Sequence, residues 1–210
     1  ADAGGPRSIK DDPYGAPSWA GFYVGIQGGY GWGDTEHSGG GFSTGAQDLS
    51  GGLFGVTWGT NWQRGNWVYG TESDFSFSSL DRSLAGAPCS PTCSTDLRDL
   101  STSRLRLGYA MGNGLAYVTG GLAYGVVRAG DSVDGDKDTR FGWALGAGVE
   151  WAFAPRWSLK AEYLHVDLGD GRHYSSGGTP IHVDFTADIV RVGVNYNLGP
   201  DFWRNTLGWR

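Results

Sequence analysis

The stretch AGFYVGIQGGYGWG, residues 20–33, divides its side chains between two faces when alternate positions are separated. One face is apolar and aromatic, broken only by Gly28, and it holds Ala20, Phe22, Val24, Ile26, Tyr30 and Trp32. The other face is almost bare, with Gly21, Tyr23, Gly25, Gln27, Gly29, Gly31 and Gly33. Alternation with a period of two is the signature of a β-strand. The same division recurs along the chain, and this recurrence decides the fold.

Seven further segments show the same alternation, with apolar faces that run over residues 49–62, 67–77, 97–111, 116–126, 141–153, 157–163 and 190–198. Long polar loops at about 34–47, 79–96, 131–138 and 169–183 alternate with tight turns at 63–66, 112–114 and 154–156. No segment with helical periodicity competes with this pattern. The sequence therefore predicts an all-β fold, an eight-stranded antiparallel up-and-down barrel with unlike rims and both termini at the short-turn rim.

Alternation alone does not say which face points outward, since a soluble lipocalin-like barrel would enclose its apolar face. Two observations favour the opposite arrangement: the aromatic bulk is too great for eight strands to enclose, and the other face is small enough for a narrow lumen. Aromatic residues also gather near strand ends, as in interfacial girdles: Trp19, Trp32, Trp58, Trp62, Trp67, Trp151 and Trp157. We therefore expect a transmembrane barrel with Phe22, Val24, Ile26 and Tyr30 against lipid. The mean hydropathy of −0.33 does not oppose this, because alternating strands average out.

Eight charged residues fall on the face of small side chains: Glu72, Asp74, Arg104, Arg106, Glu150, Lys160, Glu162 and Arg191. Four are acids and four are bases. Burying any of them without a partner would cost several kcal/mol, so the pattern predicts a mutually paired charge network across the lumen. Such a network could plug the barrel or line an ion path. We favour the plug, because eight strands leave an interior just wide enough for side chains.

Composition and charge restrict the other function classes. The net charge of −6 and the pI near 5.1 argue against nucleic acid as a partner. Cys89 and Cys93 lie in a polar loop with prolines, where they could form a small disulfide or ligate a metal, and we favour the disulfide because two thiolates offer zinc too few ligands. We expect no cofactor, no metal and no enzymatic activity, because the loop histidines His37, His173 and His182 stand in no catalytic pattern.

The chain divides into three parts. Residues 1–18 are rich in Gly, Pro and Asp and predict an irregular periplasmic arm. Residues 19–198 form the predicted barrel, and residues 199–210 form an aromatic extension at the periplasmic side. The opening Ala-Asp-Ala resembles a product of signal peptidase, which predicts an exported chain with its signal peptide removed.

Five blocks, residues 19–32, 104–110, 117–125, 142–150 and 159–169, are similar to the small outer-membrane β-barrel family of alphaproteobacteria. This porin-family group is related in architecture to opacity proteins and the OmpA transmembrane domain. The resemblance implies a Gram-negative outer-membrane barrel inserted by the barrel assembly machinery, with surface-exposed loops in contact with lipid and lipopolysaccharide. It implies a structural protein of the cell envelope with surface or protein–protein interactions. A narrow porin for small solutes is the alternative, and an outer-membrane enzyme is a third.

The end of the chain departs from the family pattern, because the sequence continues past Leu198 instead of closing on an aromatic residue. Four apolar residues of this extension are expected to lie in the periplasmic interface or to contact a neighbouring protein: Phe202, Trp203, Leu207 and Trp209. A homo-oligomer or a different membrane-protein neighbour would each fit, and the sequence does not separate the two.

Overall fold

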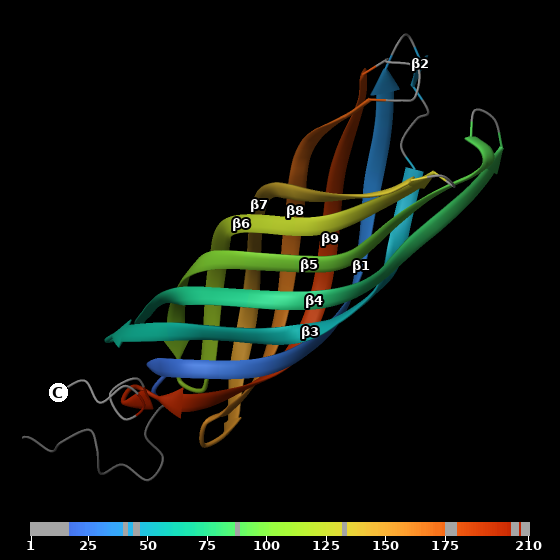
Figure 1. Ribbon diagram of the computed structural model, residues 1–210. Coiled ribbons are helices and arrows are strands. Elements are labelled where there is room, and N and C mark those ends of the chain that lie inside the picture. Colours follow the sequence, from blue (N-terminus) through green and yellow to red (C-terminus); the bar gives the residue numbers. More distant parts are fainter. Residues whose placement is uncertain are drawn as a thin grey trace, which may run out of the picture.

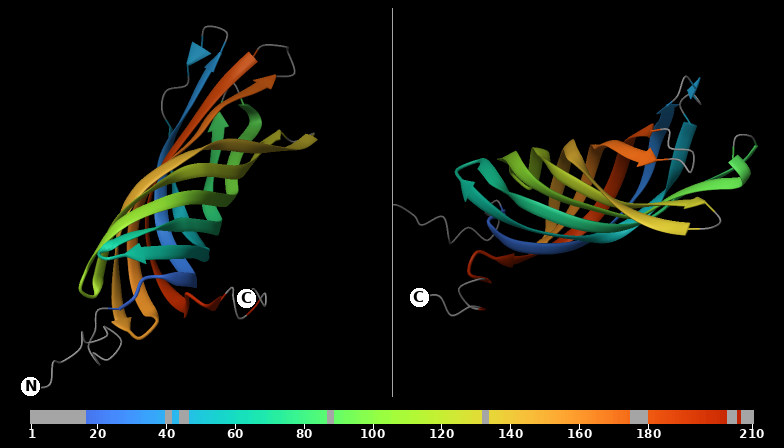
Figure 2. Two further views of the ribbon diagram at one scale, coloured as in Figure 1. Left: turned by 90° about the vertical axis from the view of Figure 1, so that its left-hand side faces the viewer. Right: turned by 45° about the horizontal axis from the view of Figure 1, so that its top comes forward.

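The described residues form one antiparallel sheet that closes on itself (Figures 1 and 2). The computed structural model describes residues 17–39, 42–43, 47–86, 89–131, 134–174, 180–202 and 206. The strands are β1 (Gly21–Gly39), β2 (Phe42–Ser43), β3 (Gln47–Arg64), β4 (Trp67–Gly86), β5 (Cys89–Met111), β6 (Gly114–Asp131), β7 (Asp134–Ala154), β8 (Trp157–Tyr174) and β9 (Pro180–Gly199). Each strand from β3 pairs with the next, and β9 pairs with β1. The two residues of β2 pair only with the end of β1, so the barrel wall has eight strands, as predicted.

Three two-residue turns connect β3 to β4, β5 to β6 and β7 to β8. Gly65 and Gly112 open the first two turns with φ of 61° and 58°. A positive φ at the first central residue but not at the second, Asn66 or Asn113, is the type II′ arrangement, whose twist suits two-residue hairpins. The third turn places Pro155 first and Arg156 second, with φ of 70° at Arg156, which is the type II order. All three predicted turns are confirmed.

The four other connections contain much more strand than predicted. β4 and β5 stay paired as far as Gly86 and Cys89, and β6 and β7 as far as Asp131 and Asp134. The prediction of polar loops over 34–47, 79–96, 131–138 and 169–183 is therefore wrong for much of their length. A strand with water on both faces needs no apolar side, so its sequence loses the period of two while its backbone pairing continues.

Large apolar side chains point outward along the barrel wall. Leu105 is 70% exposed and Phe141 is 74% exposed, and Val24, Ile26 and Tyr30 are also exposed. The inward neighbours of these residues are mostly glycine, small polar residues or charges. The predicted orientation of the two faces is confirmed. Among the described residues, no helix is long and apolar enough to cross a membrane.

Trp19 does not join the outer girdle, and this part of the prediction is wrong. Its side chain is 5% exposed and packs inside the barrel at the short-turn rim, against Val68 and Leu115. The backbone nitrogen of Trp19 donates to Gln63 Oε1 at 2.8 Å. Gly21 then turns the chain into β1 with φ of 125°, a conformation that glycine adopts readily. The indole therefore closes the mouth of the lumen.

Beyond β9, the start of the C-terminal extension lies against the outside of β1. The rings of Phe202 and Phe22 stack with centroids 4.9 Å apart and an interplanar angle of 14°. Thr206 Oγ1 donates to the carbonyl of Phe202 at 2.7 Å. Phe22, expected against lipid, is therefore half-buried and in contact with the chain's own extension. Trp203, Leu207 and Trp209 lie outside the described residues.

Phe202→Ala is expected to lower the free energy of unfolding, because it removes the ring that stacks on Phe22. A double-mutant cycle with Phe22→Ala isolates this contact, and the coupling free energy should be about 0.5–1.5 kcal/mol. Urea unfolding in lipid vesicles, followed by tryptophan fluorescence, measures it. Additive effects of the two substitutions would show that the extension does not hold the barrel through this pair.

Candidate functional site

The eight predicted charges lie together inside the barrel. They occupy inward positions on β4, β5, β7, β8 and β9, and all are buried; Lys160 is 0% exposed. The strand register places three oppositely charged pairs directly across from each other: Glu72 with Arg104, Glu150 with Lys160, and Glu162 with Arg191. Of these pairs, only Glu150 with Lys160 lies on a hairpin with a short turn, and a register shift between Ala152 and Ala154 separates the pair from that turn, so turn length alone does not fix any of the three.

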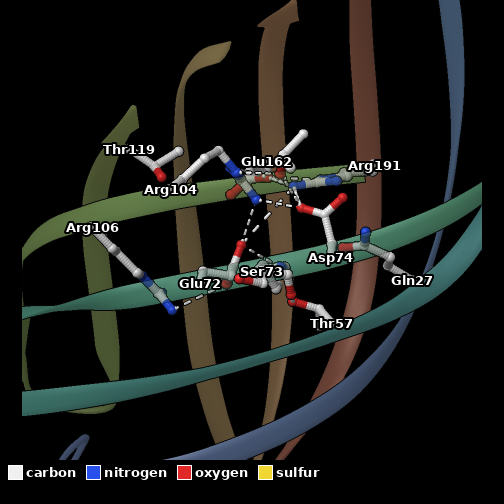
Figure 3. Close-up of polar contacts among 12 residues, drawn as sticks. Gln27, Thr57, Glu72, Ser73, Asp74, Arg104, Arg106, Thr119, Glu162 and Arg191 are labelled. Atoms are coloured by element: carbon white, nitrogen blue, oxygen red, sulfur yellow. Dashed lines mark hydrogen bonds and ion pairs between the residues drawn. The ribbon is translucent and has the colours of Figure 1, made fainter. Parts of the chain in front are cut away.

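Arg104 occupies the centre of this charge network (Figure 3). Its Nη2 lies 2.7 Å from Glu72 Oε1 and 2.9 Å from Asp74 Oδ2, and its Nη1 lies 3.1 Å from Glu162 Oε1. Its Nε donates to Thr102 Oγ1 at 2.8 Å. A guanidinium has five donors in a rigid plane, so one arginine joins three carboxylates from β4 and β8 across the lumen.

Two further cations, Arg191 and Lys160, extend the network to β9 and β8. Arg191 donates from Nε to Glu162 Oε1 at 2.7 Å and from Nη2 to Asp74 Oδ2 at 3.1 Å. Lys160 Nζ donates to Glu72 Oε1 at 3.1 Å. Contacts between β4 and β8, and between β4 and β9, cross the barrel interior, so the network ties opposite walls together.

Arg106 and Glu150 form the part of the network nearest the short-turn rim. Arg106 Nη2 pairs with Glu150 Oε2. The other oxygen of Glu150 accepts hydrogen bonds from Ser158 Oγ at 2.5 Å and from Asn195 Nδ2 at 2.8 Å. The guanidinium carbon of Arg106 also lies 3.7 Å from the centroid of the Tyr117 ring, a cation–π contact.

Tyr23 and Tyr117 belong to the network, and the sequence reasoning missed them. Tyr23 Oη donates to Glu72 Oε2 and Tyr117 Oη donates to Glu162 Oε2, both at 2.8 Å. Each ring fits beside a glycine. A Cβ at Gly59 would lie 2.6 Å from Cζ of Tyr23, and a Cβ at Gly148 would lie 2.6 Å from Cζ of Tyr117. The sequence could have identified both tyrosines as lumen residues, because each occupies an inward position among glycines.

Two apolar layers lie inside the barrel above and below the charges, and these were also missed. The layer towards the long hairpins consists of Leu53, Leu100, Ala123, Ala144, Leu164, Val166, Leu168, Ala187 and Ile189. The layer at the short-turn rim consists of Trp19, Val68, Ala110, Leu115 and Tyr117. The expectation of small residues and charges alone on the inner face is therefore wrong at both ends. The sequence contained the information needed to find these layers, because each of these residues occupies one of the alternate positions that face inward on its strand.

The remaining sequence-predicted sites lie outside what the structure describes. The backbones of Cys89 and Cys93 belong to β5, but their side chains are not among the described ones, and neither are those of His37, His173 and His182. Within the described residues, no three His, Cys, Asp or Glu side chains are arranged to hold a metal ion.

A closed eight-stranded barrel with an apolar outer wall, aromatic girdles and a charged interior defines a small transmembrane β-barrel of the outer-membrane type. Residues 13–197 match the outer membrane protein beta-barrel domain family. The chain belongs to that family, and its place is the bacterial outer membrane.

Relatives of similar length come from alphaproteobacteria. The chain is 37% identical to the 31 kDa outer-membrane immunogenic protein of Brucella melitensis biotype 1, over 92% of this chain and 89% of the relative. It is 36% identical to the 22 kDa outer membrane protein of Rhizobium leguminosarum bv. viciae, over 85% and 78%.

Among solved structures, Neisserial surface protein A matches with a TM-score of 0.50 at 15% identity, covering 85% of this chain and 98% of that one. The outer membrane protease OmpT of Escherichia coli matches with a TM-score of 0.51 at 10% identity, covering 85% and 97%. These two likenesses show the fold alone.

Proposed function

We propose that this protein is a non-conducting, non-enzymatic structural barrel of the outer membrane. It contributes to envelope integrity and carries four long hairpins outside the membrane for surface or protein–protein contacts. The filled lumen is the observation that supports this proposal. Four acids and four bases neutralise one another there, between two layers of packed apolar side chains.

The proposal follows from the cost of moving an ion through this interior. An ion path would have to displace Leu100, Leu164 and Ile189 near the long hairpins and Trp19 near the short turns. It would also have to separate Arg104 from three carboxylates, and each buried charge left unpaired costs several kcal/mol. Both requirements oppose a narrow porin.

The absence of enzymatic activity is part of the same proposal. The relatives carry names of outer-membrane and immunogenic proteins, which support surface exposure and suggest no reaction. The buried carboxylates are held by arginine, lysine, serine and asparagine donors within the barrel. This arrangement serves to hold the walls together and offers no substrate an approach.

In planar bilayers the purified barrel is expected to produce no steady channels, because its lumen holds side chains in place of water. Single-channel recording measures this, with a large-pore porin prepared in the same way as the positive control. Gel mobility before and after boiling must show the shift of a folded barrel in the same sample. Steady ohmic channels from such a folded preparation would overturn the proposal in favour of a narrow porin.

The envelope role has its own test in cells. Deleting the gene should increase sensitivity to bile salts or detergent, and the wild-type chain should restore resistance. If the deletion strain resists detergent as well as its parent does, the protein does not contribute to envelope integrity. That result would leave the closed lumen untouched, so the two parts of the proposal are tested separately.

A further inference from the structure

The register of the β4–β5 hairpin shifts close to the end of its two strands. Leu84 of β4 is paired with Cys93 of β5. Further along the hairpin, Gly86 is paired with Cys89. Between these two pairs β4 has one residue, whereas β5 has three, residues 90–92. Such an excess of residues on one strand is a β-bulge, and it shortens the distance that β5 covers beside β4.

A proline explains why the bulge lies at this point. Residues 89–93 read CSPTC, so Pro91 is the middle residue of the bulge. Proline has no backbone N–H and cannot donate to a strand ladder, so within sheets it is confined to edges, strand starts and bulges. The local sequence and the observed register therefore agree.

The bulge brings the two cysteines of the chain close together. Leu84 and Gly86 are alternate residues of β4, so they lie on one face of the sheet about 6.6 Å apart. Directly paired residues of antiparallel strands share a face, so Cys93 and Cys89 also lie on one face, with Cα atoms about 6–7 Å apart. A regular strand would separate them by about 13 Å. Disulfides need a Cα separation of about 4.4–6.8 Å, so only the bulged strand brings the pair into range.

The position of the hairpin favours oxidation of this pair. Figure 1 shows the paired strands β4 and β5, in green, extending away from the barrel wall. Phe77, which is 62% exposed on the outer wall, precedes Gly86 by a run of strand roughly 30 Å long. The cysteines therefore lie well beyond the apolar wall. An outer-membrane protein is exported from the reducing cytosol, and paired cysteines outside the cytosol are commonly oxidised.

We propose that Cys89 and Cys93 form a disulfide within β5 that closes the bulge into a covalent loop. Two exchange steps form it. The thiolate of one cysteine attacks a protein disulfide of the export compartment, and the thiolate of the other then attacks the mixed disulfide. The oxidant leaves as a dithiol that has taken up the two electrons and the two thiol protons. This inference does not depend on a closed lumen or on the envelope role.

The oxidation state is measured on protein taken directly from outer membranes. The sample is quenched in acid, unfolded and treated with N-ethylmaleimide and a chelator, so that a metal-bound pair counts as free thiols. Trypsin then releases residues 83–98, which contain both cysteines. Without reductant this peptide should carry no maleimide and be lighter by two hydrogen atoms than its reduced form, and after reduction it should carry two maleimides. An alkylated peptide without reductant, or one linked to a second copy of itself, would overturn the proposal.

A shifted pair tests whether the bulge places the cysteines. Cys93→Ser with Ser94→Cys moves the second thiol by one residue, to the opposite face of β5. In glutathione buffers the folded wild-type pair should be half oxidised at a ratio of oxidised to reduced glutathione at least about tenfold lower than the shifted pair requires.

Unfolding provides the control for this comparison. In urea the register is lost, and the two pairs should differ by less than about threefold, because closure of a flexible loop depends weakly on its length. Gel mobility before boiling shows that both folded samples contain the closed barrel. Equal ratios for the two folded proteins would overturn the placement of the pair by the bulge.

Discussion

Arg104→Met is expected to lower the free energy of unfolding by about 3–5 kcal/mol, the cost of removing one partner from a buried ion pair. Methionine fills most of the volume of arginine, so the loss reports charge and hydrogen bonds more than a cavity. Glu72, Asp74 and Glu162 would each lose a cation within 3.1 Å, in a layer that water does not reach. Urea unfolding in lipid vesicles, followed by fluorescence and gel mobility, measures the change.

Leu105→Met provides the control for this measurement. Leu105 is the next residue along β5 but faces lipid, and the same replacement there should change stability by less than about 1 kcal/mol. Adding Asp74→Asn to Arg104→Met removes one of the orphaned charges, so the double variant should be more stable than the sum of the single losses predicts. The charge network would not be structural if Arg104→Met and Leu105→Met unfolded at the same urea concentration.

Gly148→Ala should destabilise the barrel by about 1–3 kcal/mol, through one added methyl group. That methyl would lie 2.6 Å from Cζ of Tyr117. The ring cannot move away easily, because its hydroxyl donates to Glu162 and Arg106 stacks on its face. The same unfolding measurement applies. Gly120→Ala is the control, since its methyl group would face outward and meet only Cδ1 of Leu145 at 3.3 Å and the Ala144 carbonyl oxygen at 3.7 Å.

The cause of this effect can be tested in a second background. Tyr117→Leu removes the ring and should itself destabilise the barrel, because Glu162 loses a donor. In that background, Gly148→Ala should cost less than it does in the wild type, since the ring is gone and only the Ala161 carbonyl oxygen, 2.8 Å from the added methyl group, still crowds residue 148. An equal cost in both backgrounds would assign the effect of the methyl group to the strand backbone.

The sequence predicts the barrel and the orientation of its faces well, because lipid imposes the alternation. Phe22, Val24 and Ile26 differ from Tyr23, Gly25 and Gln27 since the two sets meet different solvents. Where the strands leave the bilayer this constraint ends, and the pairing of Gly86 with Cys89 has no counterpart in the hydropathy pattern. Residue type assigns Trp19 to the aromatic girdle, whereas its odd-numbered position, shared with the inward-facing Tyr23, indicates the lumen.

The alternation along each strand also identifies which charged residues belong to the network. It does not identify which of these residues contact one another. Glu72 and Arg104 are cross-strand neighbours, but β4 and β5 are joined by a long hairpin with register shifts, so the sequence does not reveal this pairing. The contact between Arg104 and Glu162 joins β5 to β8 across the lumen, and it depends on the tilt and stagger of the closed barrel. Alternation separates inward from outward positions but does not give the height of a residue along the barrel axis. The apolar layers on either side of the charges therefore could not be placed from the sequence.

The lumen charges are distributed so that each half of the sheet contributes as many acids as bases. β4 and β5 carry Glu72, Asp74, Arg104 and Arg106, while β7, β8 and β9 carry Glu150, Lys160, Glu162 and Arg191. The lumen charges of either half therefore sum to zero before the barrel closes. When β9 meets β1, partners are shared between the halves: Arg104 gains Glu162, Lys160 gains Glu72, and Arg191 gains Asp74. The pairing of these eight lumen residues is therefore complete only when the barrel has closed.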